Sequence, residues 1–327
     1  MTVIVSTIWG GRISVIADRR ISRRLPGQGV EIVDDDSNKL IVVQCYGALF
    51  AIAYTGVATA HESWMDCVIA ERLAHRRLEP SLVAPGAPML ARPAFALIDE
   101  LRINLNGVLN SDRQSRLERL ELLVQGWDFR GGRLLPFSCK LIRGAVQPNG
   151  YRYFELKHHA VAKFFREHPT GLWGETLGDD GGAIPEALEY LRSSVGFTHD
   201  DVERHLHEAI LSRSRETQTV SPACVALQLA PRIPDGQVLV TYYPHDTSPS
   251  GYTLLSPWVL TPRMICAPSI STSAYSPSSE CGSYLLGGFS DGNTQLHVTT
   301  RLPVEYGMPS GKGPLRFQFQ PRAVTPS

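Results

Sequence analysis

Apolar and polar residues alternate with a period of two along the first part of the chain, up to residue 56. Short runs rich in β-branched residues are separated there by glycine-containing turns, a pattern typical of strands that pair as hairpins. A polar stretch at 19–38, with arginines and a run of aspartates, predicts a surface loop or edge ribbon between the two hairpins. The strands expected in these hairpins are 2–9, 13–17, 39–45 and 48–54.

After residue 56 the spacing of apolar residues becomes helical, then returns to strands, and the same change happens once more. A glycine-rich turn at 178–182 precedes the second pair of helices, and Thr198 is the expected N-cap of the last one, with Asp200 and Asp201 in its first turn. The apolar stretch 160–166 is ambiguous. The helices predicted are 57–78, 93–109, 183–193 and 198–214, and the strands are 120–129, 134–142, 151–156, 223–229 and 237–243.

From about residue 246 the composition shifts toward serine, proline, glycine and threonine, and no helical spacing remains. We therefore predict two parts, a main domain over 2–245 and a small β-rich extension over 246–327 that ends in a flexible tail. Strand-like pieces of the extension are 252–259, 283–286, 295–300 and 315–319.

Composition and charge argue against nucleic acid and membranes as partners. The 327 residues, 43% of them hydrophobic, can bury a large core, and Lys+Arg and Asp+Glu balance at 32 each. The uncharged stretch 40–60 is long enough to cross a bilayer, but Gln44 and the Tyr46-Gly47 turn favour two buried strands. Six cysteines without a CxxC pair, and no readable secretory signal, predict a cytoplasmic protein with reduced thiols.

Clusters of charged residues suggest other chemistries, and each has a simpler explanation. The histidines and aspartates of the last predicted helix lack the spacing of a metal motif, so we expect a solvated helix and no metal or cofactor. The arginines near the N-terminus have no interleaved aromatic residues, which disfavours a nucleic-acid patch. The first cluster is His199, Asp200, Asp201, His205 and His207, and the second is Arg19, Arg20, Arg23 and Arg24.

Thr2 has the most specific chemical potential in the sequence. Removal of the initiator Met1 would leave it as an N-terminal threonine at the head of a strand. Its hydroxyl can then attack a carbonyl while its own α-amine, with a reference pKa of about 7.7 to 8.0, takes the proton. Such a residue carries both nucleophile and base.

Several short motifs follow Thr2 in a specific order. They are Thr2-Val-Ile-Val, Ala17-Asp18-Arg19-Arg20, Ser37-Asn38-Lys39-Leu40, Tyr54-Thr55-Gly56-Val57-Ala58, and Leu122-Leu-Val-Gln-Gly-Trp-Asp128 before a Gly-Gly turn. In this order they resemble proteasome β-type subunits and their bacterial relatives, which are N-terminal nucleophile hydrolases. The resemblance covers roughly 2–243 and implies an α+β fold, a four-layer αββα sandwich, to which the extension is added.

The resemblance also implies roles for individual residues. Thr2 would be the nucleophile and base, and Lys39, paired with Asp18, would supply positive charge beside the hydroxyl. The backbone N–H of Gly56 would stabilise the oxyanion. The backbone around Arg20, Ile21 and Ser22 would bind the substrate as an added strand, with Arg20, Ile21 and the Gly56 region shaping its first pocket.

Three further positions complete the implied site but depart from the family pattern. Asp179 stands where serine is usual, Glu216 where aspartate is usual, and Thr219 where serine is usual. A carboxylate at Asp179 beside the α-amine would favour its charged form and weaken it as a base near neutral pH.

The function implied is a threonine-type peptidase acting on a peptide or protein substrate, in a homo-oligomeric ring that an ATPase partner would feed. Two alternatives stay open from the sequence. One is an amidase acting on a small non-peptide amide, and the other is a catalytically silent structural or interaction subunit.

Overall fold

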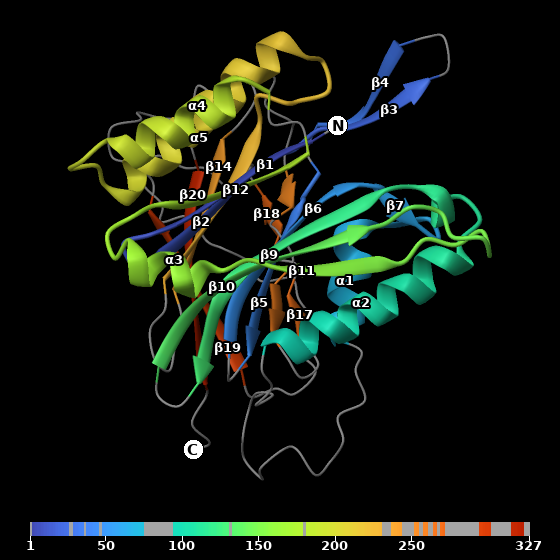
Figure 1. The fold of residues 1–327 in the computed structure, drawn as a ribbon, viewed down its shortest axis with the longest axis horizontal. Coiled ribbons are helices and arrows are strands. Elements are labelled where there is room, and N and C mark those ends of the chain that lie inside the picture. Colours follow the sequence, from blue (N-terminus) through green and yellow to red (C-terminus); the bar gives the residue numbers. More distant parts are fainter. Residues whose placement is uncertain are drawn as a thin grey trace.

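The computed structural model places most of the main domain and separate strands of the extension. It describes residues 2–25, 29–35, 37–45, 48–74, 94–130, 133–178, 181–230, 237–243, 252–254, 258–260, 264–266, 269–271, 294–301 and 315–323. The described part is a mixed α/β structure dominated by two large sheets (Figure 1). The mixture of helices and strands predicted from the changes of period is therefore confirmed, and the largely antiparallel sheets agree with the α+β class that the resemblance implies.

The first sheet contains β1, the first strand of the chain, and Thr2 lies immediately before that strand. Its strands run in the order β12-β1-β2-β13-β14-β20-β19, with antiparallel pairing throughout. Gly10 and Gly11, both at positive φ, make the tight turn between the first two strands. The strands are β1 (Val3–Trp9), β2 (Arg12–Asp18), β12 (Trp173–Gly178), β13 (Cys224–Ala230), β14 (Gln237–Tyr243), β19 (Thr294–Arg301) and β20 (Leu315–Ala323).

The second sheet has the order β11-β10-β9-β6-β5-β16-β17. Its pairing is antiparallel except between β5 and β16, which are parallel. Gly126 lets two backbones approach closely, because a Cβ there would lie 2.1 Å from the Cβ of Phe50. The strands are β5 (Leu40–Cys45), β6 (Ala48–Gly56), β9 (Leu120–Arg130), β10 (Arg133–Arg143), β11 (Phe154–His158), β16 (Trp258–Leu260) and β17 (Met264–Cys266).

Both faces of the first strand are buried, and they face different apolar clusters. Ile4 and Ile8 pack with residues of β5 and β6, whereas Val3 and Val5 pack against the helices α4 and α5. Successive side chains of a strand point to opposite faces, so one strand serves both clusters. This explains why β1 reads as an almost continuous apolar run in the sequence.

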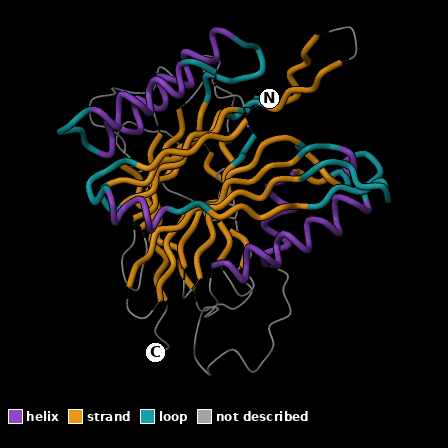
Figure 2. The backbone as a smooth tube through the Cα atoms, in the orientation of Figure 1, coloured by secondary structure: helices purple, strands orange, loops and turns teal. Residues whose placement is uncertain are grey.

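The helices follow the predicted spacing with shifted ends, and Figure 2 shows them outside the strands. Thr198 caps α5 in a capping box with Asp201, as expected. The ambiguous stretch at 160–166 forms a helix. The helices are α1 (Met65–Ala74), α2 (Ala94–Ser111), the short 3-10 helix η2 (Ser115–Leu117), α3 (Val161–Glu167), α4 (Ala183–Ser193) and α5 (His199–Glu216).

The start predicted for the first helix, residue 57, is wrong. The chain first makes a small hairpin of β7 (Thr59–Ala60) and β8 (Ser63–Trp64), and the helix begins only at Met65. His61 and Glu62 form the turn at positive φ, a strained conformation for non-glycine residues. The end predicted for this helix, at 75–78, lies outside the described residues.

The polar stretch between the first hairpins forms a two-stranded ribbon that projects from the body beside the N-terminus (Figure 1). It consists of β3 (Ile21–Leu25) and β4 (Gly29–Asp34). This agrees with the edge ribbon expected from the sequence.

Strands of the extension add to one edge of each large sheet. β16 lies beside β5 in the second sheet, and β20 lies beside β14 in the first. Two further strands, β15 (Tyr252–Leu254) and β18 (Ser269–Ser271), pair only with each other. The strand expected at 283–286 and the tail beyond 323 lie outside the described residues, and the boundary at 245/246 stays a prediction.

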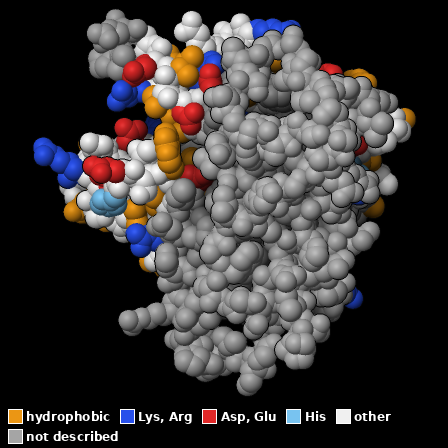
Figure 3. Space-filling view, turned by 180° about the vertical axis from the view of Figure 1, so that it is seen from behind, with side chains coloured by type: hydrophobic (Ala, Val, Ile, Leu, Met, Phe, Trp, Pro, Cys, Tyr) orange, Lys and Arg blue, Asp and Glu red, His pale blue; other side chains and the backbone are white. Residues whose placement is uncertain are grey.

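In the view from behind, described side chains are visible only at the margins of the face, and both acidic and basic ones occur among them (Figure 3). Among the described helices, none has the length and apolar character needed to cross a bilayer.

Candidate active site

Thr2 lies immediately before β1 and borders a cavity of about 600 Å³. Its side chain is only 7% exposed. Gly178, at the end of β12, faces its backbone, because a Cβ at that position would lie 1.9 Å from the Thr2 carbonyl oxygen. With φ at +86°, residue 178 is a position where only glycine fits, and the close approach fixes where Thr2 enters the sheet.

Lys39 and Asp18 meet at the Thr2 hydroxyl. The Lys39 Nζ donates to Thr2 Oγ1 at 2.8 Å and to the two Asp18 carboxylate oxygens at 3.2 and 3.1 Å. Both charged side chains are almost completely buried. A buried ion pair of this kind costs desolvation on both sides, so its presence beside one hydroxyl points to chemistry more than to stability.

Backbone N–H groups hold the Asp18 carboxylate in place. It accepts hydrogen bonds from Val3 N at 2.7 Å, Arg20 N at 3.1 Å and Ser221 N at 3.4 Å. These donors engage both carboxylate oxygens, which also accept from Lys39 Nζ. The negative charge that balances Lys39 is therefore fixed by three chain segments.

Burial lowers the pKa of Lys39 from 10.5, and the charge of Asp18 opposes that shift. Lys39 precedes β5 and is held there by its neighbours, since its carbonyl accepts from Tyr54 N at 3.1 Å. The Tyr54 hydroxyl donates to Asn38 O at 2.9 Å. The ammonium consequently has little freedom to move away from Thr2.

Gly56 ends β6 on the cavity wall. Its φ is +111°, and a Cβ would lie 2.1 Å from the Arg119 carbonyl oxygen, so no other residue fits this position. The next residue, Val57, donates its N–H to the same carbonyl at 2.9 Å. The segment around residue 119 therefore fixes the backbone that the sequence assigns to oxyanion binding.

Thr219 and the predicted substrate-binding residues Arg20, Ile21 and Ser22 also border the cavity. The Thr219 hydroxyl lies 2.9 Å from that of Thr217. Residues from six separate parts of the chain thus converge on one cavity, and the sequence named most of them.

Two residues of the sequence-derived set are not brought to the cavity by the described structure. Glu216 ends α5, is half exposed, and pairs with Arg213 at 2.6 Å. Asp179 lies outside the described residues, so its place beside the α-amine stays a prediction.

Tyr54, Thr55 and Ala58, which flank Gly56 in its motif, also line the cavity, and the sequence missed three further residues of its wall: Leu117, Glu118 and Arg119. Arg143 fixes the last three, because its guanidinium donates to the carbonyls of Ser115, Arg116 and Glu118 at 2.7 to 3.1 Å. Burial lowers its pKa to about 10. A lone arginine at the end of a predicted strand gave no signal of this role.

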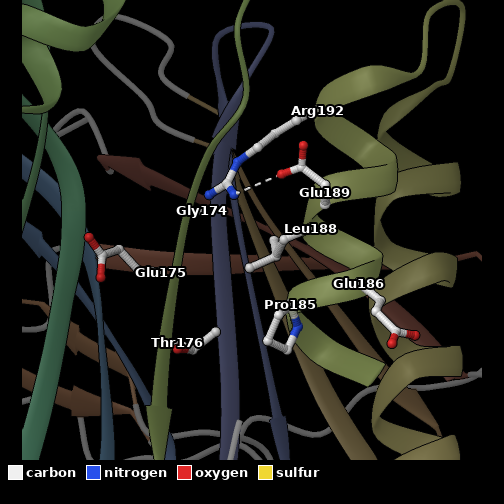
Figure 4. Close-up of a pocket in the computed structure, with 8 residues that line it drawn as sticks. All are labelled: Gly174, Glu175, Thr176, Pro185, Glu186, Leu188, Glu189 and Arg192. Carbon is white, nitrogen blue, oxygen red and sulfur yellow. Dashed lines mark ion pairs between the residues drawn. The ribbon is translucent and has the colours of Figure 1, made fainter. Parts of the chain in front are cut away.

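A second cavity, of about 530 Å³, lies between β12 and α4 (Figure 4). Carboxylates surround it, and the Arg192 guanidinium reaches back toward Gly174. Glu189 pairs with Arg192 at 3.7 Å, and Glu175 pairs with Lys140 at 2.8 Å. The cavity residues are Gly174, Glu175, Thr176, Pro185, Glu186, Leu188, Glu189 and Arg192.

The histidines of α5 serve different contacts. His199 packs against Trp9, the ring of His205 stacks on Tyr190, and His207 stacks on Tyr243. Within the described ranges, no group of three His, Cys, Asp or Glu side chains could hold a metal ion.

Comparison with known proteins identifies no family. No family model matches the sequence, and no curated protein matches it. The chain is similar to a solved Anbu (Gly-1) mutant from Hyphomicrobium sp. strain MC1, at 12% identity over 70% of this chain and 81% of that one, with a TM-score of 0.46. Two others are Anbu (ancestral beta-subunit) from Yersinia bercovieri and the helical assembly of the Anbu complex from Pseudomonas aeruginosa. Both share 14% identity over 69% of this chain and 80% of theirs, with TM-scores of 0.44 and 0.42.

These comparisons correct the family assignment made from the sequence. The chain cannot be placed among proteasome β-type subunits on its short motifs, because no family model or curated sequence supports that assignment, and the three solved structures named above are Anbu proteins. Motifs of four or five residues are weak when most of the chain has diverged. With TM-scores below 0.5, the likeness to Anbu carries no functional argument either, so the function rests on the geometry of the site.

Proposed function

We propose that this protein is a threonine-type N-terminal nucleophile hydrolase that cleaves peptide bonds, built as a four-layer αββα sandwich. The observation that carries the proposal is the 2.8 Å hydrogen bond from Lys39 Nζ to Thr2 Oγ1, backed by the buried Asp18. A buried ammonium beside an aliphatic hydroxyl favours the developing alkoxide. Thr2 becomes the N-terminal residue once Met1 is removed.

In the first half of the reaction, the Thr2 Oγ attacks the carbonyl carbon of the scissile bond and its proton passes to the Thr2 α-amine. The carbonyl becomes an oxyanion, which the backbone N–H of Gly56 stabilises. When the intermediate collapses, the C–N bond breaks and the leaving amine takes the proton from the α-amine. An ester on Thr2 remains.

In the second half, water attacks the ester carbonyl and gives a proton to the α-amine. The C–O bond to Thr2 breaks, and the hydroxyl regains the proton, so the enzyme returns to its starting state. Lys39 stays protonated throughout and stabilises negative charge on Oγ.

The position of Gly56 supports a peptide as substrate. It ends a strand at the cavity, and the segment 20–22 borders the same cavity, so an extended chain in the cavity would lie between two backbone segments. A small non-peptide amide needs no such flanking strands.

Two measurements test the proposal. Intact mass of the purified protein should show a chain that begins at Thr2, and a mature protein that retains Met1 contradicts the mechanism. Hydrolysis of a library of peptide aminomethylcoumarins should be lost in Thr2→Ala and partly kept in Thr2→Ser. Equal rates in wild type and Thr2→Ala would remove Thr2 from the reaction.

Self-assembly into a homo-oligomer stays a prediction from the sequence, and electron microscopy of the purified protein tests it directly. An ATPase partner has no support in the comparisons.

A further inference from the structure

Arg20 and Asp35 form an ion pair at the base of the β3–β4 ribbon. The Arg20 Nε donates to Asp35 Oδ1 at 2.6 Å, and Nη2 donates to Oδ2 at 2.9 Å, so the contact is a two-bond fork. The arginine side chain is 10% exposed and the aspartate 38%. Such a fork fixes orientation as well as distance.

The same guanidinium reaches a third segment of the chain. Its Nη1 donates to the carbonyls of Gln218 at 2.8 Å and Val220 at 3.3 Å. These carbonyls flank Thr219, which lines the same cavity as Thr2. Arg20 therefore holds the backbone on both sides of Thr219.

The backbone of Arg20 contacts the buried ion pair directly. Its N–H donates to Asp18 Oδ2 at 3.1 Å, and its carbonyl accepts a hydrogen bond from Lys39 Nζ. Arg20 therefore contacts Asp18, Lys39 and the backbone on both sides of Thr219, so a shift of Arg20 would move all three.

We propose that the Arg20–Asp35 pair is a positioning device that fixes the 217–221 segment and the Arg20 backbone around the reacting hydroxyl of Thr2. This inference rests on the proposed hydrolase function. It also reassigns the Arg20 side chain: four of its five N–H groups donate to Asp35, Gln218 and Val220, so its guanidinium serves the protein and not the substrate.

A neighbouring ion pair on the same ribbon provides the matched control. Arg23 and Glu31 also pair at 2.9 Å, but both side chains are largely exposed and neither borders the cavity. An exposed ion pair of this kind contributes little to the free energy of unfolding. Disrupting it changes the ribbon's charge without touching the segment 217–221.

The test compares Asp35→Asn, Asp35→Glu, Arg20→Lys and the control Glu31→Gln with peptide aminomethylcoumarins as substrates. Arg20→Lys keeps the charge but loses the fork and one or both carbonyl contacts. We expect Asp35→Asn and Arg20→Lys to lower kcat by about tenfold or more with KM nearly unchanged, because misplaced catalytic groups slow the chemical step. Asp35→Glu should recover part of the loss, and Glu31→Gln should match wild type.

Different outcomes overturn different claims. If Thr2→Ala is inactive while Asp35→Asn and Arg20→Lys keep the wild-type kcat, the positioning role is wrong and the hydrolase stands. If Thr2→Ala is as active as wild type, the proposed function fails. Amide hydrogen exchange then tests the contact itself: faster exchange at 217–221 in Asp35→Asn, but not in Glu31→Gln, supports the clamp, and unchanged protection overturns it.

Discussion

The two cavities of this protein have similar volumes but very different walls. The Thr2 cavity, about 600 Å³, has the proposed nucleophile, a buried ion pair and a glycine whose backbone position excludes every other residue. The cavity between β12 and α4, about 530 Å³, has carboxylates whose partners are partly exposed and a glycine that faces a flexible side chain. Size does not separate them. What separates them is how many polar groups are buried and held by more than one segment, and that density is the physical mark of a reacting centre.

The largest expected effect tests the nucleophile. Thr2→Ala removes the attacking oxygen, so we expect peptide hydrolysis to fall by at least about 10⁴-fold. The matched control is Thr176→Ala, which removes a threonine from the wall of the second cavity. Its kcat should equal that of wild type. A comparable loss of kcat in Thr176→Ala would contradict the assignment of the reaction to the Thr2 cavity.

The second effect compares two ion pairs. Asp18→Asn leaves the buried Lys39 charge without its partner, which should lower the free energy of unfolding by about 3 to 5 kcal/mol and abolish most activity. Glu189→Gln, on the exposed side of the second cavity, should change the free energy of unfolding by less than about 0.5 kcal/mol. Urea unfolding of both variants measures the contrast, and equal effects would contradict it.

The third effect compares two glycines. Gly56→Ala places a Cβ against the Arg119 carbonyl at a positive φ, and the backbone shift should reduce kcat by about 10² to 10³-fold through a lost oxyanion donor. Gly174→Ala brings its Cβ within 2.9 Å of Leu188 Cδ2, the end of a side chain that can rotate away. It should keep wild-type kcat in the same assay. A normal kcat in Gly56→Ala would remove that N–H from the mechanism.

The smallest effect is in the pH dependence. Because burial lowers the pKa of Lys39 below 10.5, its charge is lost before that pH is reached, and kcat should decline along an alkaline limb that starts below 10.5. Stability should respond with the opposite sign. Between the lowered pKa and 10.5 the unfolded chain binds more protons than the folded one, so this group's contribution to stability rises with pH. Lys39→Met should lack that contribution in urea unfolding at pH 8 and 10.

The sequence predicted most of the secondary structure because local patterns determine it. Thr198 and Asp201 mark the start of α5 as a capping box, and the apolar runs of β5 and β6 mark two buried strands. The first helix was misplaced because the hairpin before it is stabilised by contacts with α2. The His61 Nε2 lies 3.2 Å from the Val108 carbonyl oxygen of α2, and this contact compensates the strain of the turn. No local sequence pattern indicates such a turn.

Only those site residues that stand in a recognisable order of motifs could be predicted from the sequence. Thr2, Lys39 and Gly56 could be named from their order, and the cavity contains all three. The roles of Asp35, Ser221 and Arg143 depend on segments far apart in the sequence, and a single carboxylate, backbone N–H or arginine has no local signature. Glu216 shows the converse: it has the spacing that the resemblance implies, but it is the last residue of α5, and its side chain pairs with Arg213 one turn earlier.

The first and last described strands of the chain, β1 and β20, belong to the same sheet. Contacts between segments this far apart form slowly, because loop closure precedes the contacts that reward it. During synthesis the sheet therefore stays incomplete until the final strand has emerged, while its first residue is already outside. A methionine aminopeptidase needs a free, extended N-terminus, and Thr2 is only 7% exposed once β1 has packed. The strand that packs against Thr2 is β12, whose Gly178 lies against the Thr2 carbonyl, and it is synthesised long after Thr2 itself. This delay would give a time window for processing, in which the proposed nucleophile is released before the fold encloses it.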